Sequence, residues 1–150
     1  MKSTRSLSLL LAVLGSACST AASEVDFCQV LTAAPKFEAR TIKTEIIVVP
    51  DQHAWFATTS QCNSVVMHFA DSSFAGSTAL QKLGDQVKTA YRMRDSASAL
   101  KGVEVRVTAR VDKISSPDST RPGYVLRLLD ADSGRLVDIP KEFLQAPGSR

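Results

Sequence analysis

The sequence predicts a mainly β domain, a five-stranded barrel with helices, and three observations support this class. The chain has 150 residues, enough for one domain with its own core. Two long segments have strand patterns: Glu38 to Val49 is rich in β-branched residues, and Val103 to Val111 alternates between apolar and polar residues. The expected elements follow the order of a small helix, three strands, a helix and two strands. This order favours a closed Greek-key barrel.

The first residues have the three-part order of an export signal. Lys2 and Arg5 are basic, the run from Leu7 to Leu14 is apolar apart from one serine, and small residues follow. The apolar run is too short to span a bilayer as a stable helix. We therefore expect an exported protein, located in the periplasm or the cell envelope, with residues 1–22 as its signal peptide.

Two processing routes remain open for this signal. In one, a signal peptidase cuts after a small residue such as Ala17 or Ala22, and the product is soluble. In the other, Cys18 is lipidated, because the run from Leu14 to Cys18 resembles a bacterial lipobox, although Gly15 stands where leucine is usual. The second route would give a lipoprotein, with the outer membrane as one expected location.

Export determines how the cysteines are interpreted. Cys18 is either removed or lipidated, which leaves Cys28 and Cys62. In an oxidising compartment such a pair usually forms a structural disulfide. A loop of about 35 residues closed in this way stabilises a fold by roughly 3 to 4 kcal/mol. The alternative is a reactive thiol with His68 as its base.

The first elements of the domain are a helix and three strands. Ser23, three residues before an acid, predicts the start of a short helix from about Glu24 to Ala33, which ends before Pro35. The strand from Glu38 to Val49 follows. Two further strands, His53 to Thr59 and Cys62 to Ala70, complete an expected antiparallel meander.

A second helix and a hairpin follow. Leu80, Leu83, Val87 and Tyr91 recur at helical spacing, although Gly84 lies among them. Val103 to Val111 is the fourth strand. After a turn-rich loop from Ser115 to Gly123, Tyr124 to Leu129 is the fifth strand, and a short strand from Arg135 to Ile139 is expected to pair with it. The domain is expected to span residues 23–145, with residues 146–150 as a frayed tail.

This order is that of an OB fold with an additional N-terminal helix. The run Cys28-Gln29-Val30-Leu31, followed by Pro35, Phe37 and the Thr41-Ile42 strand, also resembles small exported bacterial proteins of unassigned function with a Cys-x-x-Leu N-terminal helix. The resemblance covers about Phe27 to Phe69. It implies an OB-like barrel and brings no catalytic residues.

Composition and motifs narrow the function. Without Lys2 and Arg5, 16 basic residues oppose 15 acidic ones, so the body has no field that attracts nucleic acid. Trp55 and Phe56 point to opposite faces of one strand. Arg106, Arg110 and Arg127 are interleaved with Glu104 and Asp112, as on a solvated barrel exterior. No metal-ligand spacing, catalytic serine motif or phosphate-binding glycine loop is present, so no metal or cofactor is expected.

The sequence therefore predicts a non-enzymatic binding or assembly module of the bacterial cell envelope. Its partner is expected to be a protein, a glycan or another envelope component, and its contact with the membrane is limited to a lipid on Cys18. The expected binding face lies near His53 and Trp55, beside the loop from Ser115 to Gly123. The alternative is a small envelope hydrolase or metal-dependent enzyme that uses His53, His68 and Asp71.

Overall fold

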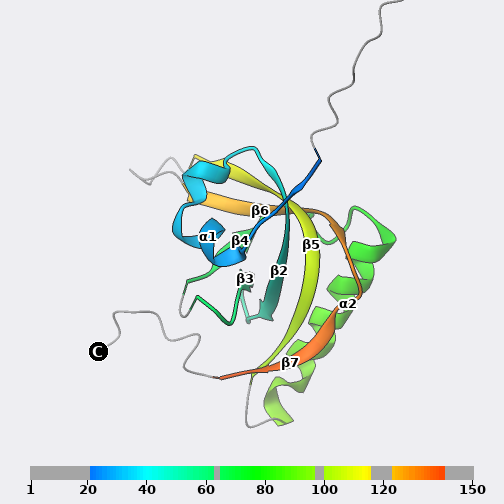
Figure 1. The fold of residues 1–150 in the computed structure, drawn as a ribbon. Helices are drawn as coiled ribbons and strands as arrows, with labels where there is room; N and C mark the ends of the chain where they lie inside the picture. Colours follow the sequence, from blue (N-terminus) through cyan, green and yellow to red (C-terminus); the bar gives the residue numbers. More distant parts are fainter. Residues whose placement is uncertain (1–20, 63–64, 97–99, 116–122, 141–150) are drawn as a thin grey trace, which may run out of the picture.

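The computed structural model describes residues 21–62, 65–96, 100–115 and 123–140, and it confirms the predicted barrel. The barrel strands follow one another around the barrel in the order β2, β3, β4, β6, β5, and β5 pairs with β2 to close it. The β4–β6 pairing is parallel, and the other barrel pairings are antiparallel. This is the OB topology, in which α2 follows the third barrel strand and precedes the fourth along the chain (Figure 1). The strands are β2 (Thr41–Pro50), β3 (Trp55–Thr58), β4 (Met67–Phe69), β5 (Leu100–Ile114) and β6 (Gly123–Ala131).

The core is built mainly from the alternation of β2 and β5. Val103, Val105, Val107, Ala109 and Val111 are all buried, as the period of two predicts. On β2, Ile42, Ile46 and Val48 face the same core. The middle strands are shorter than predicted, because β3 and β4 cover only part of the segments from His53 to Thr59 and from Cys62 to Ala70.

The first helix begins later than expected. α1 (Phe27–Thr32) follows a two-residue strand, β1 (Ser23–Glu24), which pairs in parallel with β2. Asp26, rather than Ser23, caps the helix and accepts a hydrogen bond from the Cys28 N–H at 2.9 Å. The prediction was wrong here because β1 takes the residues assigned to the first turn. A 3₁₀ turn, η1 (Ala34–Phe37), then leads into β2.

The disulfide between Cys28 and Cys62 is present, with the two Cα atoms 5.3 Å apart. Cys62 lies in the turn after β3 and not at the start of a strand, so the bond joins α1 to the β3–β4 connection. Phe27 and Val30 belong to the barrel core. The helix is therefore held by both apolar contacts and a covalent bond.

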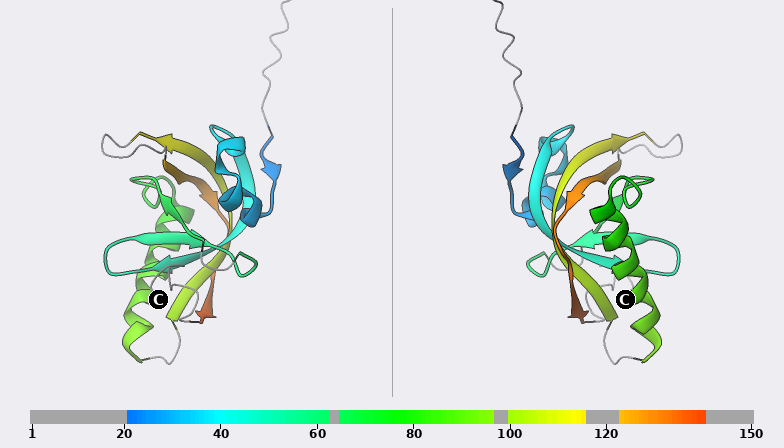
Figure 2. Two further views of the ribbon diagram at one scale, coloured as in Figure 1. Left: turned by 90° about the vertical axis from the view of Figure 1, so that its left-hand side faces the viewer. Right: turned by 90° about the vertical axis from the view of Figure 1, so that its right-hand side faces the viewer.

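The second helix, α2 (Thr78–Arg92), lies on a different side of the barrel from α1 (Figure 2). The Ser77 hydroxyl caps it by accepting a hydrogen bond from the Leu80 N–H. Leu80, Leu83 and Val87 are buried, whereas Tyr91 is 40% exposed, contrary to the predicted stripe. Ala90 is buried instead, and a further 3₁₀ turn, η2 (Met93–Ser96), follows.

The last strand, β7 (Arg135–Ile139), pairs with β5 and not with β6 as predicted. β6 covers β5 from Val107 onward, which leaves the segment Leu100–Glu104 open on that side. Ile139 packs there against Ile47 and Val49 in a second, smaller apolar cluster outside the barrel. The tail beyond residue 140 and most of the loop from Ser115 to Gly123 lie outside the described residues.

None of the helices in the described ranges is long and apolar enough to cross a membrane.

Candidate binding groove on the barrel exterior

Four outward-facing side chains form a row across the barrel exterior. The strand registers place Phe56 opposite His68, His68 beside Val125, and Val125 opposite Asp112. Each is adjacent in its strand to a core residue (Ala57, Met67, Leu126 and Val111 respectively), so its own side chain faces outward. The row crosses β3, β4, β6 and β5, and it brings together residues from four separate parts of the sequence.

A groove runs along this face, and we call it the outer groove. Its volume is about 810 Å³, and it lies over β4, β6 and the end of β5. Val125, only 7% exposed, and Ile114, 46% exposed, give it apolar surface. The other lining residues are Glu38, Ala39, His68, Phe69, Ala70, Asp71, Arg110, Asp112, Lys113 and Arg127.

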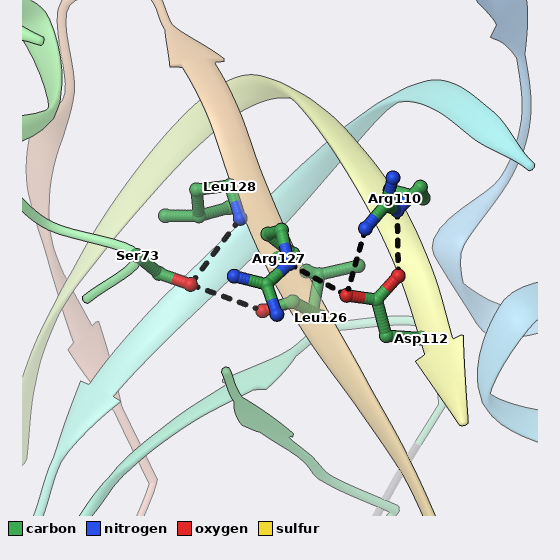
Figure 3. Close-up of polar contacts among 6 residues, drawn as sticks. All are labelled: Ser73, Arg110, Asp112, Leu126, Arg127 and Leu128. Carbon is green, nitrogen blue, oxygen red and sulfur yellow. Dashed lines mark hydrogen bonds and ion pairs between the residues drawn. The ribbon is translucent and has the colours of Figure 1, made fainter. Parts of the chain in front are cut away.

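Asp112 joins two arginines at the rim of the outer groove (Figure 3). Arg110 donates from Nε to Oδ1 at 2.6 Å and from Nη2 to Oδ2 at 3.3 Å. Arg127 donates from Nε to Oδ2 at 2.6 Å. The hydrogen bond from Arg110, followed by that from Arg127, lowers the pKa of Asp112, although partial burial opposes this. Asp112 is therefore a permanent anion at neutral pH, held between two planar cations.

Ser73 fixes the strand that carries Arg127. Its side chain is buried, and its hydroxyl accepts a hydrogen bond from the Leu128 N–H at 3.3 Å. The same hydroxyl donates to the Leu126 carbonyl at 3.4 Å (Figure 3). β4 ends at Phe69, and the Ala70 N–H still donates to the Leu126 carbonyl, so Ser73 replaces a longer β4 as the partner of the Leu128 N–H. The backbone is thereby held on both sides of Arg127.

The two aromatic residues of β3, Trp55 and Phe56, point to opposite faces of the strand, as predicted. Phe56 meets the His68 ring edge to face on the exterior, with ring centroids 4.8 Å apart. Trp55 turns the other way and contacts Phe74, also at 4.8 Å, on the side of the core. Trp55 also lines a small hollow beside α2 that includes Tyr91.

His53, the other residue of the expected binding face, is exposed in the turn between β2 and β3. Its neighbour Asp51 pairs with Arg94 at 3.0 Å. The Gln52 N–H and then Arg94 lower the pKa of Asp51. This turn and the outer groove are separate surfaces, because neither His53 nor Trp55 lines the groove.

The residues proposed for an enzyme are only partly brought together. His68 and Asp71 both line the outer groove, whereas His53 does not. In the described part of the chain, no group of three or more histidine, cysteine or carboxylate side chains is arranged to hold a metal ion.

Sequence reasoning named five charged residues of the barrel and interpreted them as ordinary exterior: Arg106, Arg110, Arg127, Glu104 and Asp112. The structure separates them into distinct pairs: Arg106 contacts Glu24, and Arg135 contacts Glu104, both away from the groove. Only Arg110, Asp112 and Arg127 share one site. Val125 was missed as a groove residue because its strand pattern gives no sign of which outward positions meet.

No protein-family model matches the chain, and no curated protein or solved structure resembles it at a significant level.

Proposed function

We propose that this protein is an exported, non-enzymatic binding or assembly module of the bacterial cell envelope, and that the outer groove is its contact surface. The observation that carries the proposal is the pairing of an apolar floor with a charged rim fixed by ion pairs. The groove involves the third barrel strand and the ends of the β5–β6 connection. OB folds commonly bind ligands at this part of the barrel, and we use that as an analogy between folds.

Two features support export. The first residues have the order of a secretion signal, and the disulfide between Cys28 and Cys62 suits an oxidising compartment. The intact mass of the mature protein from its native host tests this. We expect either a free new N-terminus after Ala17 or Ala22 or a diacyl or triacyl group on Cys18, together with the loss of two hydrogens for the disulfide. A full-length, reduced chain would contradict export.

The chemistry of the rim favours recognition over reaction. A general base works best with a pKa near the working pH, and the pKa of Asp112 is lowered from an already acidic value. Its two partners are arginines, whose guanidinium groups offer donors and no acceptor. The rim therefore offers fixed donors and acceptors, which suit a ligand's polar groups.

A matched pair of surface variants tests the proposed contact surface. Ile114 is 46% exposed and lines the outer groove, whereas Leu129 is 44% exposed on β6 and lies outside it. Purified mature protein is sedimented with washed membranes and with sacculi from a Gram-negative host. We expect Ile114→Asp to reduce the bound fraction at least tenfold, and Leu129→Asp to leave it unchanged. Equal binding by the two variants, or no binding of the wild type to either fraction, would contradict the proposal.

The enzyme alternative retains one supporting observation, the presence of His68 and Asp71 in one groove. Alanine at both His53 and His68 tests it. If deletion of the gene gives a host phenotype and the double variant still complements it, the enzyme alternative loses its candidate histidines. Loss of complementation by a variant that is folded and still binds the envelope would favour catalysis.

A further inference from the structure

The guanidinium of Arg127 is anchored at one end and open at the other. Its Nε donates to Asp112 at 2.6 Å, while Nη1 and Nη2 have no partner among the residues that the structure describes. The side chain is 42% exposed and lines the outer groove. Two parallel N–H donors are thus available to a ligand in the groove.

Three contacts hold this arginine in place before any ligand binds. Asp112 fixes its Nε, Arg110 holds Asp112 from the other side, and Ser73 fixes the backbone next to it (Figure 3). An arginine held in this way loses less side-chain freedom when it binds. Its two terminal nitrogens match the spacing of two oxygens in a planar oxyanion.

The charges around the groove favour a single small anionic group over a polyanion. Among the described residues that line it, the three cations Arg110, Lys113 and Arg127 are balanced by three carboxylates, Glu38, Asp71 and Asp112. A balanced groove has no long-range field that would gather a highly charged chain. Selectivity must then come from the geometry of the Arg127 fork and from the apolar surface of Val125 and Ile114.

We propose that the outer groove binds a carboxylate group through the paired N–H donors of Arg127, with an apolar part of the same ligand on Val125 and Ile114. This inference rests on the proposed function and names its ligand chemistry. Two sources in a cell envelope carry such a group: the carboxylate of a peptide and that of an acidic sugar. Both offer the same two oxygens to the fork.

Matched probes separate these sources. For the peptide, N-acetyl-trialanine is compared with its C-terminal amide; for the sugar, N-acetylmuramic acid is compared with N-acetylglucosamine. Inorganic phosphate is the third probe. Binding is followed by chemical shifts of the backbone amides of Val125, Arg127 and Asp112 in the mature, disulfide-bonded protein. We expect one acid to bind at least tenfold more tightly than its neutral partner and more tightly than phosphate.

Two arginine-to-lysine variants provide the control. Arg127→Lys keeps the charge but removes the paired donors, and we expect it to weaken binding of the acid at least tenfold. The control is Arg106→Lys. Arg106 lies on β5, pairs with Glu24 and does not line the groove, so this variant should not change binding of the acid. The dispersion of the amide spectrum checks that both variants are folded.

The inference fails if acid and neutral probes bind alike, if phosphate binds more tightly than either acid, or if Arg127→Lys binds the acid as well as the wild type. Such a failure is distinguishable from failure of the proposed function. If Ile114→Asp loses envelope binding but Arg127→Lys keeps it, the proposed binding function holds and the carboxylate inference fails. If the protein binds the carboxylate but not the envelope, the carboxylate inference holds and the proposed function fails.

Discussion

Removing the disulfide should destabilise the protein without unfolding it. We expect the double variant Cys28→Ser/Cys62→Ser to fold, because Phe27 and Val30 are 1% and 0% exposed and keep α1 packed on the barrel core. The bond itself acts mainly on the unfolded chain, whose freedom it restricts. Its loss should therefore lower the free energy of unfolding while leaving the native contacts in place.

The magnitude follows from the size of the closed loop. The two cysteines are 34 residues apart, and a loop of that length corresponds to about 4 kcal/mol in the chain-entropy relation. Domains of this size lose about 2 kcal/mol of stability per molar urea. The midpoint of urea unfolding should then fall by about 2 M in the double variant.

The protein contains a natural probe for this experiment. Trp55 is its only tryptophan and is half-buried against Phe74, so its fluorescence should change when the barrel unfolds. Reduced wild-type protein, unfolded in the same buffer with reductant, serves as the matched control and should coincide with the double variant. A midpoint that shifts by less than about 0.5 M would refute the loop-entropy reasoning. A variant that fails to fold would show that the apolar contacts of α1 are insufficient.

Three further predictions concern single side chains. Ser73→Ala should lower the free energy of unfolding by about 1 to 2 kcal/mol, because it leaves the Leu128 N–H without its partner, whereas Ser133→Ala, at an exposed site, should have no measurable effect. Thr44→Val should raise the free energy of unfolding by about 1 kcal/mol, because the buried Thr44 hydroxyl has no hydrogen-bond partner in the described ranges. Unchanged or lower stability in urea would contradict this. Arg110 and Arg127 lower the pKa of folded Asp112, so the carboxylate stabilises the fold above its unfolded pKa of about 3.9 and loses this effect as the pH falls through the lowered value. The stability advantage of wild type over Asp112→Asn should thus be constant from about pH 7 to pH 5 and disappear as the pH falls through the lowered pKa. An advantage that grows on acidification would contradict the sign.

The barrel could be predicted from the sequence because its main signals are local. The alternation from Val103 to Val111 fixes which side of β5 is buried, and the β-branched run in β2 does the same for its partner. The disulfide followed from cysteine count and expected export. Short-range periodicity and composition are sufficient for such features, since neither depends on how distant segments meet.

Features that depend on tertiary contacts were predicted less well. The start of α1 was misplaced because pairing of β1 with β2 competes with helix formation at Ser23–Glu24. Tyr91 has helical spacing, yet the barrel core takes in Ala90 of α2 instead, and the Tyr91 ring stays exposed. The partner predicted for β7 was wrong because the sequence does not show how much of β5 is left unpaired by β6. In each case, the competing interaction comes from a segment far away in the sequence.

The outer groove shows why a binding site of this kind is hidden in a sequence. The groove contains three members of the row formed by Phe56, His68, Val125 and Asp112, namely the last three. That row depends on two antiparallel registers and one parallel register. A shift of one residue in any of them would turn one member of the row toward the core and replace it with a buried neighbour. The alternation pattern fixes only the face of each residue, whereas the closed barrel fixes which outward residues meet. Substitutions that alter register, rather than charge, should therefore disrupt this surface most completely.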